Sequence, residues 1–554
     1  MNNGAIADQF TLLAKLMDIH GEDSFKSKTY SNAAFQIDRM QDPIADIDQS
    51  QLSSIRGIGQ GVAQKIIELL ETGTLSSLQE IIQKTPAGIL ELMQIKGIGP
   101  KKISTIWHEL GIESPGELLY ACNENRLVHY KGFGEKSQQS IKEAIDFYFS
   151  NQQRFLYAQI EPFAHVIEKK LKHYFSHCEV KLTGSFLRQC DIIDELTIVI
   201  STHVEDIIET LSQDNQFKFQ ENEQGVLKFL YQEIIPLEIH ACDAYSFTET
   251  VFFTTNTAEF NDEFQERFPE VEFEGNETEV DLFAQADLPF IPPCLREQTS
   301  SLLHAQQGTL TDLIQASDIK GIIHNHSTWS DGASTIEEMA MACIQKGFEY
   351  FVISDHSVTS FYANGLSIDR IFQQHEEIDR LNEKLKPFKI FKSIECDILG
   401  EGQLDYSDDI LATFDLVIAS VHQNLKMTQE KAMQRLLRAI ENPYTRIIGH
   451  PTGRLLLSRK EYPIDYMQLI EACAKYHVII EINANPRRLD LDWQWIQTAI
   501  EHKVMLSINP DAHSIEGIDD IRYGVLSAQK GMLTSKSNLS SLSLAEFEAF
   551  LKQK

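Results

Sequence analysis

Histidine and carboxylate residues recur at a regular interval in the C-terminal part of the chain, each after a short apolar run. These residues are His324, His326, Asp331, His356, Glu395, His422, His450, Asp511 and His513. Successive runs end about 27–39 residues apart, which is the length of a strand followed by a returning helix. Side chains that leave the carboxyl ends of parallel strands converge on one face of a barrel. The pattern therefore predicts a metal site at that face.

The chemistry of this set indicates which ions would bind and what they would do. Imidazole with few carboxylates suits Mn, Zn or Fe better than Mg or Ca. Such ions would neutralise an anionic substrate and lower the pKa of a bound water. We expect Asp511 or His513 to handle the proton. Arg454 is a candidate phosphate clamp, because a guanidinium can grip two phosphate oxygens; the alternative is a surface arginine paired with an acid.

Three kinds of sequence pattern follow one another along the chain and predict a multidomain α + α/β protein. Residues 1–150 read as helices broken by glycine turns. Residues 151–287 contain strand-like and helical runs, which predict a mixed α/β domain, and the Pro-containing stretch 288–317 reads as a linker. Residues 318–554 alternate between apolar strands and amphipathic helices in seven units, which predicts a (βα)7 barrel.

One glycine pattern occurs three times in residues 1–150. The copies are Arg56-Gly57-Ile58-Gly59, Lys96-Gly97-Ile98-Gly99-Pro100-Lys101 and Lys131-Gly132-Phe133-Gly134. Such a turn leaves backbone N–H groups free at the start of the next helix, where a phosphate binds well. The alternative is a plain helix–helix connection with glycine in the left-handed region. Three copies, each with a cation beside the first glycine, favour phosphate contact.

These turns resemble helix-hairpin-helix motifs, which bind the DNA backbone without reading its sequence. Together with the stretch from Phe25 to Ala34, the first turn resembles the N-terminal domain of family X DNA polymerases. In that family the lysine at the position of Lys65 can form a Schiff base with an abasic-site sugar. The alternative is an exposed helix lysine.

The fragment Leu182-Thr-Gly184-Ser185-Phe-Leu-Arg188 resembles the turn with which family X polymerases hold the incoming triphosphate. The family's three metal-binding aspartates fall here on Glu195, Thr197 and Glu238, and threonine cannot supply a bridging charge. The nucleotidyltransferase palm is therefore expected to be degenerate. Its predicted role is to space the two ends of the chain or to dock a repair protein.

The C-terminal pattern resembles the PHP (polymerase and histidinol phosphatase) family, a distorted seven-stranded barrel that holds up to three metals. The resemblance implies one metal at His324, His326, Glu395 and Asp511, a second at Glu395, His422 and His450, and a third at Asp331, His356 and His513. Asn483 and Arg487 follow the strand to which the family assigns no ligand, and we expect them to line the cleft.

The composition of the chain indicates its charge distribution, the state of its thiols and its cellular location. The 554 residues carry a net charge of −32, of which −19 falls within residues 151–317. Eight cysteines without paired spacing predict reduced thiols. The sequence has neither a long apolar run nor a signal peptide, so we expect a cytoplasmic protein with no membrane contact.

The order of the three patterns resembles the bacterial family X DNA polymerases with a C-terminal PHP domain. It implies a metal-dependent DNA phosphoesterase of repair type. We expect a monomeric 3′–5′ exonuclease on single-stranded, gapped or 3′-end DNA, with 3′-phosphatase or abasic-site cleavage as related reactions. The rival hypotheses are a small-molecule phosphatase of histidinol-phosphate type, a working gap-filling polymerase and a non-catalytic scaffold.

Overall fold

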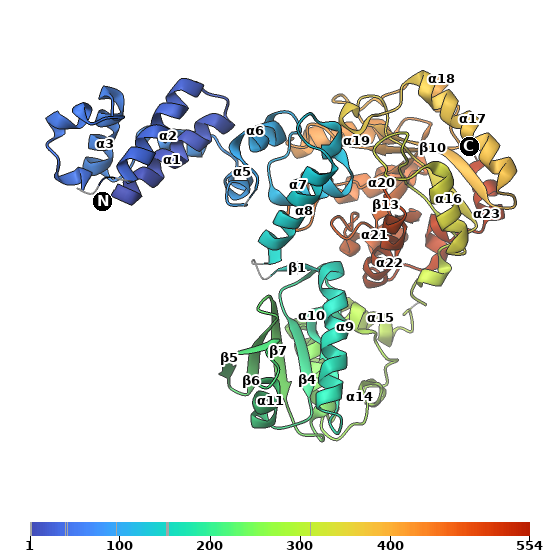
Figure 1. The fold of residues 1–554 in the computed structure, drawn as a ribbon. Helices are drawn as coiled ribbons and strands as arrows, with labels where there is room; N and C mark the ends of the chain where they lie inside the picture. The colour runs from blue at the N-terminus through green and yellow to red at the C-terminus, as the bar shows by residue number, and fades with distance from the viewer. Residues whose placement is uncertain are drawn as a thin grey trace. The chain divides into compact units, whose positions relative to one another are not determined.

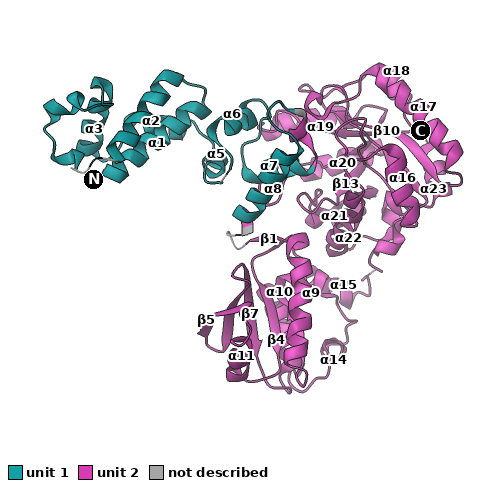
Figure 2. Ribbon diagram, viewed as in Figure 1, with its two compact units in different colours: residues 1–123, 130–148 teal, residues 124–129, 149–554 magenta. Residues whose placement is uncertain are grey.

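The computed structural model describes residues 3–38, 40, 43–95, 97–150, 154–310 and 312–553. The chain divides into two compact units, residues 1–123 with 130–148, and residues 124–129 with 149–554 (Figure 2). No described helix is both long and apolar enough to cross a bilayer.

The first unit is built from helices (Figure 1). They are α1 (Asn3–Ile19), α2 (Ser24–Asp38), α3 (Gln60–Thr72), α4 (Ser76–Gln83), α5 (Ala87–Leu92), α6 (Pro100–His108), α7 (Pro115–Asn123) and α8 (Glu135–Ser150). Buried apolar residues of α1 to α4, among them Phe10, Ile37 and Ile66, pack into one core. Residues 124–129, which include the short helix η3 (Arg126–His129), group with the second unit.

A five-stranded mixed sheet lies in the N-terminal part of the second unit. Its strand order is β2-β4-β7-β6-β5, with β4 and β7 parallel. The strands are β2 (Val180–Thr183), β4 (Leu196–Ile200), β5 (Phe217–Glu223), β6 (Val226–Tyr231) and β7 (Ile235–Ala241), and β1 (Phe155–Leu156) pairs with β3 (Ile192–Ile193). The helices are α9 (Tyr157–Tyr174), α10 (Gly184–Leu187), α11 (Val204–Leu211), α12 (Phe247–Thr255), α13 (Ala258–Arg267) and α14 (Glu279–Gln285).

Residues 288–317 differ from the expected linker. Leu288, Ile291 and Leu295 are buried in one core with Phe252 and Phe264 of α12 and α13. The segment also contains α15 (Ser300–Gln306). The prolines of this segment predicted a linker between domains. Its apolar side chains are instead buried in the core, and the burial of apolar surface makes the segment part of the folded unit.

Seven parallel strands form the barrel, in the order β14-β13-β12-β11-β10-β9-β8. They are β8 (Gly321–Ile322), β9 (Tyr350–Ile353), β10 (Lys389–Asp397), β11 (Leu416–Ser420), β12 (Thr445–Ile448), β13 (Ile479–Asn483) and β14 (Leu506–Asn509). A parallel bridge between Asn325 and Ala512 joins the two edges, so the barrel is nearly closed. The continuous burial of β9, β11, β13 and β14 is typical of parallel strands covered on both faces.

Helices return between the strands, as the seven-unit pattern predicted. They are α16 (Ile336–Gln345), α17 (Ile368–Lys384), α18 (Asp408–Leu411), α19 (Gln429–Ile440), α20 (Tyr466–Tyr476), α21 (Ile496–Glu501), α22 (Ile521–Lys530) and α23 (Leu544–Leu551). Thr335, Thr428, Asp465 and Ser543 cap four of them by accepting a backbone N–H bond.

Alternate residues of the strands serve two cores. Phe351 and Ile353 pack against the surrounding helices, whereas Tyr350 and Val352 belong to a cluster that includes Phe547 of α23. The N–H of Leu544 also donates to Glu349, directly before β9. Helix α23 therefore covers the amino ends of the strands and leaves the carboxyl ends for the site.

Candidate metal centre

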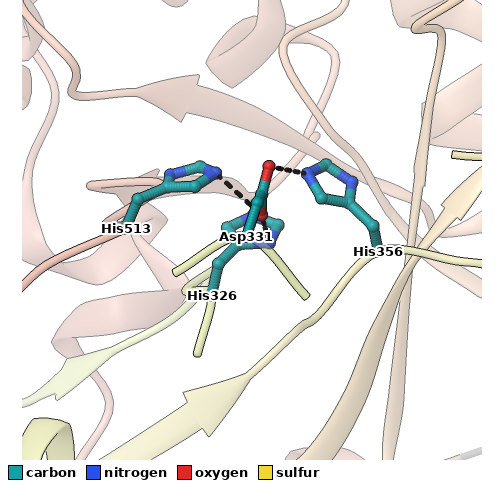
Figure 3. A group of neighbouring side chains, drawn as sticks. All are labelled: His326, Asp331, His356 and His513. Carbon is teal, nitrogen blue, oxygen red and sulfur yellow. Dashed lines mark ion pairs between the residues drawn. The ribbon is translucent and has the colours of Figure 1, made fainter. Parts of the chain in front are cut away.

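The nine predicted ligands gather at the carboxyl ends of the barrel strands. Eight of them are at most 6% exposed, and His422 is partly buried. Figure 3 shows His326, Asp331, His356 and His513 facing one another. The Asp331 carboxylate lies 3.5 Å from His356 Nε2 and 3.5 Å from His513 Nε2.

Glu395, at the end of β10, is the centre of the cluster. Its Oε1 lies 2.9 Å from His450 Nε2, 3.0 Å from His422 Nε2 and 3.3 Å from His324 Nε2. Its Oε2 lies 3.0 Å from His356 Nδ1. The same Oε2 lies 3.6 Å from His326 Nε2. One carboxylate thus faces five imidazoles, and its two oxygens could contact different ions.

Four groups of ligand atoms are close enough to hold an ion. They are His326, Asp331, His356 and His513; His324, His326 and Asp511; His324, Glu395 and His450; and His356, Glu395 and His422. The grouping implied by the PHP resemblance keeps Asp331, His356 and His513 together, and the structure adds His326 to them. In the structure, His450 groups with His324, and His422 groups with His356.

The donor atoms fit divalent cations. His324 Nε2, His356 Nε2, His513 Nε2 and Glu395 Oε2 are buried without a hydrogen-bond partner among the described residues, and such atoms are costly unless something pairs with them. Burial, reinforced by His513 and His356, lowers the pKa of His326 to about 3, so its ring is neutral and able to coordinate. Burial raises the pKa of Glu395, but the imidazoles of His422 and His324 outweigh it and keep the carboxylate ionised.

Two carboxylates contact the Nδ1 atoms of ligand histidines, on the side of the ring away from Nε2. Glu481 Oε2 lies 2.6 Å from His324 Nδ1, and Asp397 Oδ1 lies 2.6 Å from His422 Nδ1. Such contacts fix the tautomer, so that Nε2 faces the metal. The sequence reasoning missed both residues. A signal existed in β13, where Glu481 interrupts an apolar buried strand and therefore needed a partner.

The backbone is bent sharply at ligand positions. His324 has φ of 64° and Asp511 has φ of 53°. Residues other than glycine rarely adopt the left-handed region of positive φ. Those that do are concentrated at functional sites. The bends follow the strands directly, which turns both side chains toward the barrel mouth.

Arg454 is held in a different way from the one expected of a phosphate clamp. Its guanidinium donates to Asp492, to Asp191 at 3.3 Å and to the Arg488 carbonyl at 2.9 Å. These partners occupy its donors, as in the paired-arginine alternative. Arg488 lies closer to the ligands, with Nε 3.8 Å from Asp511 Oδ2.

Asn483, which was expected to line a cleft, is fully buried within the cluster. It donates to Asp511 Oδ2 and to Glu481 Oε1, both at 3.0 Å. Arg487 is half-buried. Burial raises the pKa of Asp520, and the positive charge of Arg487 opposes this rise.

Comparisons with known proteins agree with this architecture. A helix-hairpin-helix domain family matches residues 1–75, a SAM-like helix-hairpin-helix tandem matches residues 89–146, and the PHP domain family matches residues 323–485. The DNA polymerase/3′-5′ exonuclease PolX of Bacillus subtilis is 35% identical over 560 residues, which cover 98% of each chain. The chain belongs to the PolX family.

Relatives of the barrel alone are named as phosphatases. A probable phosphatase of Caldanaerobacter subterraneus is 33% identical over 171 residues, which cover 29% of this chain and 60% of that protein. One of Photobacterium profundum is 31% identical over 164 residues, covering 29% and 62%. Asp511 and His513 lie beyond the matched PHP range, and the structure brings them to the same cluster.

The palm of this PolX-family chain contains a second cluster of acidic side chains, and a lysine side chain lies between them. Gly184, Ser185, Arg188, Glu195, Thr197 and Glu238 all line one hollow with a volume of 430 Å³. Thr197 pairs with Glu238 across β4 and β7, as the metal-binding positions of a palm would. Lys228 Nζ contacts Glu238 and lies 3.0 Å from Glu195 Oε2. A hydrogen bond from His240, joined by that from Lys228, lowers the pKa of Glu238 to about 2.

Other polar residues of the palm are also engaged. Arg188, matched to a triphosphate-binding arginine, pairs with Glu297 and donates to the Thr255 carbonyl at 2.6 Å. Asp194 pairs with Arg154 at 2.9 Å. Among the described residues, the groups that could hold a metal all lie in the barrel.

The three glycine turns of the first unit share one conformation. Gly57, Gly97 and Gly132 have φ of 88°, 97° and 96°. Gly59 and Gly99 are the N-caps of α3 and α6, and Gly134 immediately precedes α8. The glycines of the turns are exposed, as are Arg56, Lys101 and Lys131, and the apolar residue between each pair of glycines is buried. Lys96 lies outside the described residues. Lys65 donates to Ser77 Oγ at 2.7 Å.

Proposed function

We propose that this PolX-family chain is a metal-dependent DNA phosphoesterase that removes nucleotides from 3′ ends. The observation that carries the proposal is the buried set of nine ligands, whose unpartnered donor atoms face one another at the barrel mouth. We assign it two or three ions of Mn, Zn or Fe, because imidazole dominates the donor set. The same centre would accept 3′-phosphates and abasic-site ends, since each presents a phosphoester.

The chain's own residues would prepare the reaction. Glu395 would bridge two ions, while Glu481 and Asp397 keep His324 and His422 in the coordinating tautomer. Bound ions would polarise the phosphoester and make hydroxide available near neutral pH. Asp511 and His513 stand beside this space and would hold the proton released from water.

The first unit would bring DNA to this centre. Each glycine turn presents unblocked backbone N–H groups at the start of α3, α6 or α8, with Arg56, Lys101 and Lys131 exposed nearby. Contacts of this kind recognise phosphates and not bases. We therefore expect binding to single-stranded and gapped DNA that weakens steeply with salt.

The palm is proposed to have lost DNA synthesis. Lys228 stands between Glu195 and Glu238, so an ammonium already occupies the position between these carboxylates where a metal ion would bind. The name of the Bacillus subtilis relative makes polymerase activity the second candidate. Primer extension on gapped DNA separates the two: robust nucleotide addition that Glu195→Ala abolishes would favour polymerase. Lyase activity through Lys65 needs a separate test: DNA with an abasic site is incubated with the chain and borohydride, which reduces a Schiff base to a stable crosslink, and Lys65→Ala should remove that crosslink.

The decisive experiment is a nuclease assay. Purified protein with Mn²⁺ should shorten 3′ ends of labelled single-stranded and gapped DNA, and His324→Ala should abolish this. Intact DNA in both samples would refute the proposal. Comparable turnover of a small phosphate monoester and of DNA would favour the phosphatase alternative.

Two predictions concern partners and assembly. We propose that the acidic palm surface contacts a repair protein and that the chain is a monomer. Sedimentation of the purified chain tests the second. Crosslinking to repair proteins, with and without charge reversal at Glu270, Glu272 and Glu274, tests the first.

A further inference from the structure

A buried carboxylate lies directly before the ligand His356 and is itself outside the ligand groups. Asp355 follows β9 and is fully buried. Among the described residues, it is a member of none of the four groups that could hold an ion. Burial of a carboxylate is costly unless hydrogen bonds compensate for it. The partners of Asp355 therefore indicate what this side chain does.

Five hydrogen bonds converge on the Asp355 carboxylate. Its Oδ1 accepts from the Ser327 N–H at 2.8 Å, from the Ser330 N–H at 3.2 Å and from the Ser330 hydroxyl. Its Oδ2 accepts from the Ser327 hydroxyl at 2.7 Å and from Gln374 Nε2 at 2.6 Å. The three partner residues are at most 3% exposed. Hydrogen bonds are stronger in such an interior than in water, so the two serines are held firmly to one carboxylate.

Both serines adjoin metal ligands. Ser327 directly follows His326, and Ser330 directly precedes Asp331. Each serine donates through its backbone N–H as well as through its hydroxyl, so Asp355 fixes the main chain and not only two side chains. The carboxylate is thus bonded to the segment between two ligands, and a third ligand is the next residue along its own chain.

The segment between these ligands is a tight turn. The Gly332 N–H donates to the Ser327 carbonyl at 2.9 Å. A Cβ at Gly332 would lie 2.5 Å from the carbonyl oxygen of His326, so the turn packs closely on itself. Gln374 belongs to α17 and donates to the other carboxylate oxygen. Asp355 therefore joins the turn to a helix that surrounds the barrel.

We propose that Asp355 is a positioning residue for the ion site formed by His326, Asp331, His356 and His513 (Figure 3). It acts through the two serines, which hold His326 and Asp331 at the spacing that one ion needs. Ligands that are already ordered bind more tightly than ligands that binding must order. The assignment rests on the metal centre of the proposed function, and it predicts an effect centred on one of the four ligand groups.

The test measures Mn²⁺ binding to the full chain by titration calorimetry. Asp355→Ala should weaken the binding of one ion about 10- to 100-fold, as loss of an outer carboxylate does in other metal sites. Asp331→Ala removes a ligand of the same ion, so the double variant should bind Mn²⁺ no more weakly than Asp331→Ala alone. Asp415→Ala is the matched control: this carboxylate accepts the Lys392 N–H at 2.9 Å directly before β11, at the amino ends of the strands, and its loss should leave Mn²⁺ binding unchanged.

Two further measurements separate positioning from general support of the fold. In the metal-free chain, Asp355→Ala should speed amide exchange in residues 327–332 and leave exchange in β11, β12 and β13 at the wild-type rate. Asp355→Asn keeps one oxygen that can accept from the serines. It should therefore recover part of the Mn²⁺ affinity and remain about 3- to 10-fold weaker than wild type.

The assignment is overturned by wild-type Mn²⁺ affinity in both Asp355 variants, by additive losses in the double variant, or by faster exchange throughout the barrel. If Asp355→Ala does not fold, Asp355→Asn decides, and wild-type affinity in that variant overturns the assignment. A wild type that binds no Mn²⁺ would overturn both proposals. A wild type that binds Mn²⁺ and leaves DNA intact would refute the proposed function, while the same titrations still decide the role of Asp355.

Discussion

The palm and the barrel each gather carboxylates at strand ends, but they neutralise them differently. In the palm, the Lys228 ammonium lies between Glu195 and Glu238. In the barrel, the described ion pairs of the nine ligands are formed among themselves, with Glu481, Asp397 and Glu124, or with Arg126 and Arg488 at 3.8 Å. The palm therefore contains its own cation, whereas the barrel retains donor atoms that require one.

The loss of the palm metal site that we propose would not require loss of the fold. Lys228 and Glu238 face each other across β6 and β7, so a lysine on the neighbouring strand, together with His240, engages the Glu238 carboxylate. The strands β6 and β7 also pair along their backbones, so the sheet does not depend on a metal ion. In the barrel, nine residues from six strand ends would have to change together.

The largest expected effect concerns Glu395. Glu395→Ala removes the carboxylate that faces His324, His356, His422 and His450, so we expect phosphoesterase activity to fall about 100- to 1000-fold. Turnover of DNA with Mn²⁺ measures it. Glu238→Gln in the palm is the matched control and should remain within twofold of wild type. Equal losses in both variants would end the distinction between the two clusters.

A smaller loss is expected when an orienting carboxylate is altered. Glu481→Gln leaves every ligand in place but weakens the contact that sets the His324 tautomer. Metal affinity and activity should fall about 10- to 100-fold. Titration with Mn²⁺ measures the first, and excess Mn²⁺ should restore part of the activity. An unchanged metal affinity would show that His324 does not depend on Glu481.

Removal of divalent ions should destabilise the barrel and not the palm. At an ion concentration 100 times Kd, binding contributes about 2.7 kcal/mol to the folded state. Chelation should therefore lower the melting temperature reported by tryptophan fluorescence, because Trp329, Trp493 and Trp495 lie in the barrel. Amide exchange in β4, β6 and β7 should stay the same. Faster exchange there on chelation would mean that the palm also binds an ion.

The smallest expected effect concerns the stability of the palm when Lys228 is replaced. Lys228→Met leaves Glu195 and Glu238 without their cation, and we expect a loss of about 1–2 kcal/mol in palm stability. Faster amide exchange in β6 and β7 would report it. Mn²⁺ should slow that exchange again in the variant but not in the wild type. If Mn²⁺ has no effect on the variant, the ion pair has not replaced a metal.

The sequence predicted the barrel and its ligands because strand ends in a parallel barrel converge whatever the side-chain conformations are. It could not predict which ligands share an ion, since that depends on which ring nitrogen each histidine presents. Arg454 was misread because Asp492 and Asp191 are distant in sequence. Lys228 was missed for a related reason, since it reaches Glu195 and Glu238 through strand register.

Helix α23 has a consequence for the order in which the protein matures on the ribosome. Its Phe547 stacks on Tyr350 at 4.5 Å and closes the cluster at the amino ends of the strands. Domains generally fold from the N-terminus during synthesis, so the glycine turns can form long before residues 544–551 emerge. A nascent chain would hold DNA-binding turns ahead of a finished hydrolytic centre, and cleavage would begin only once synthesis has passed α23.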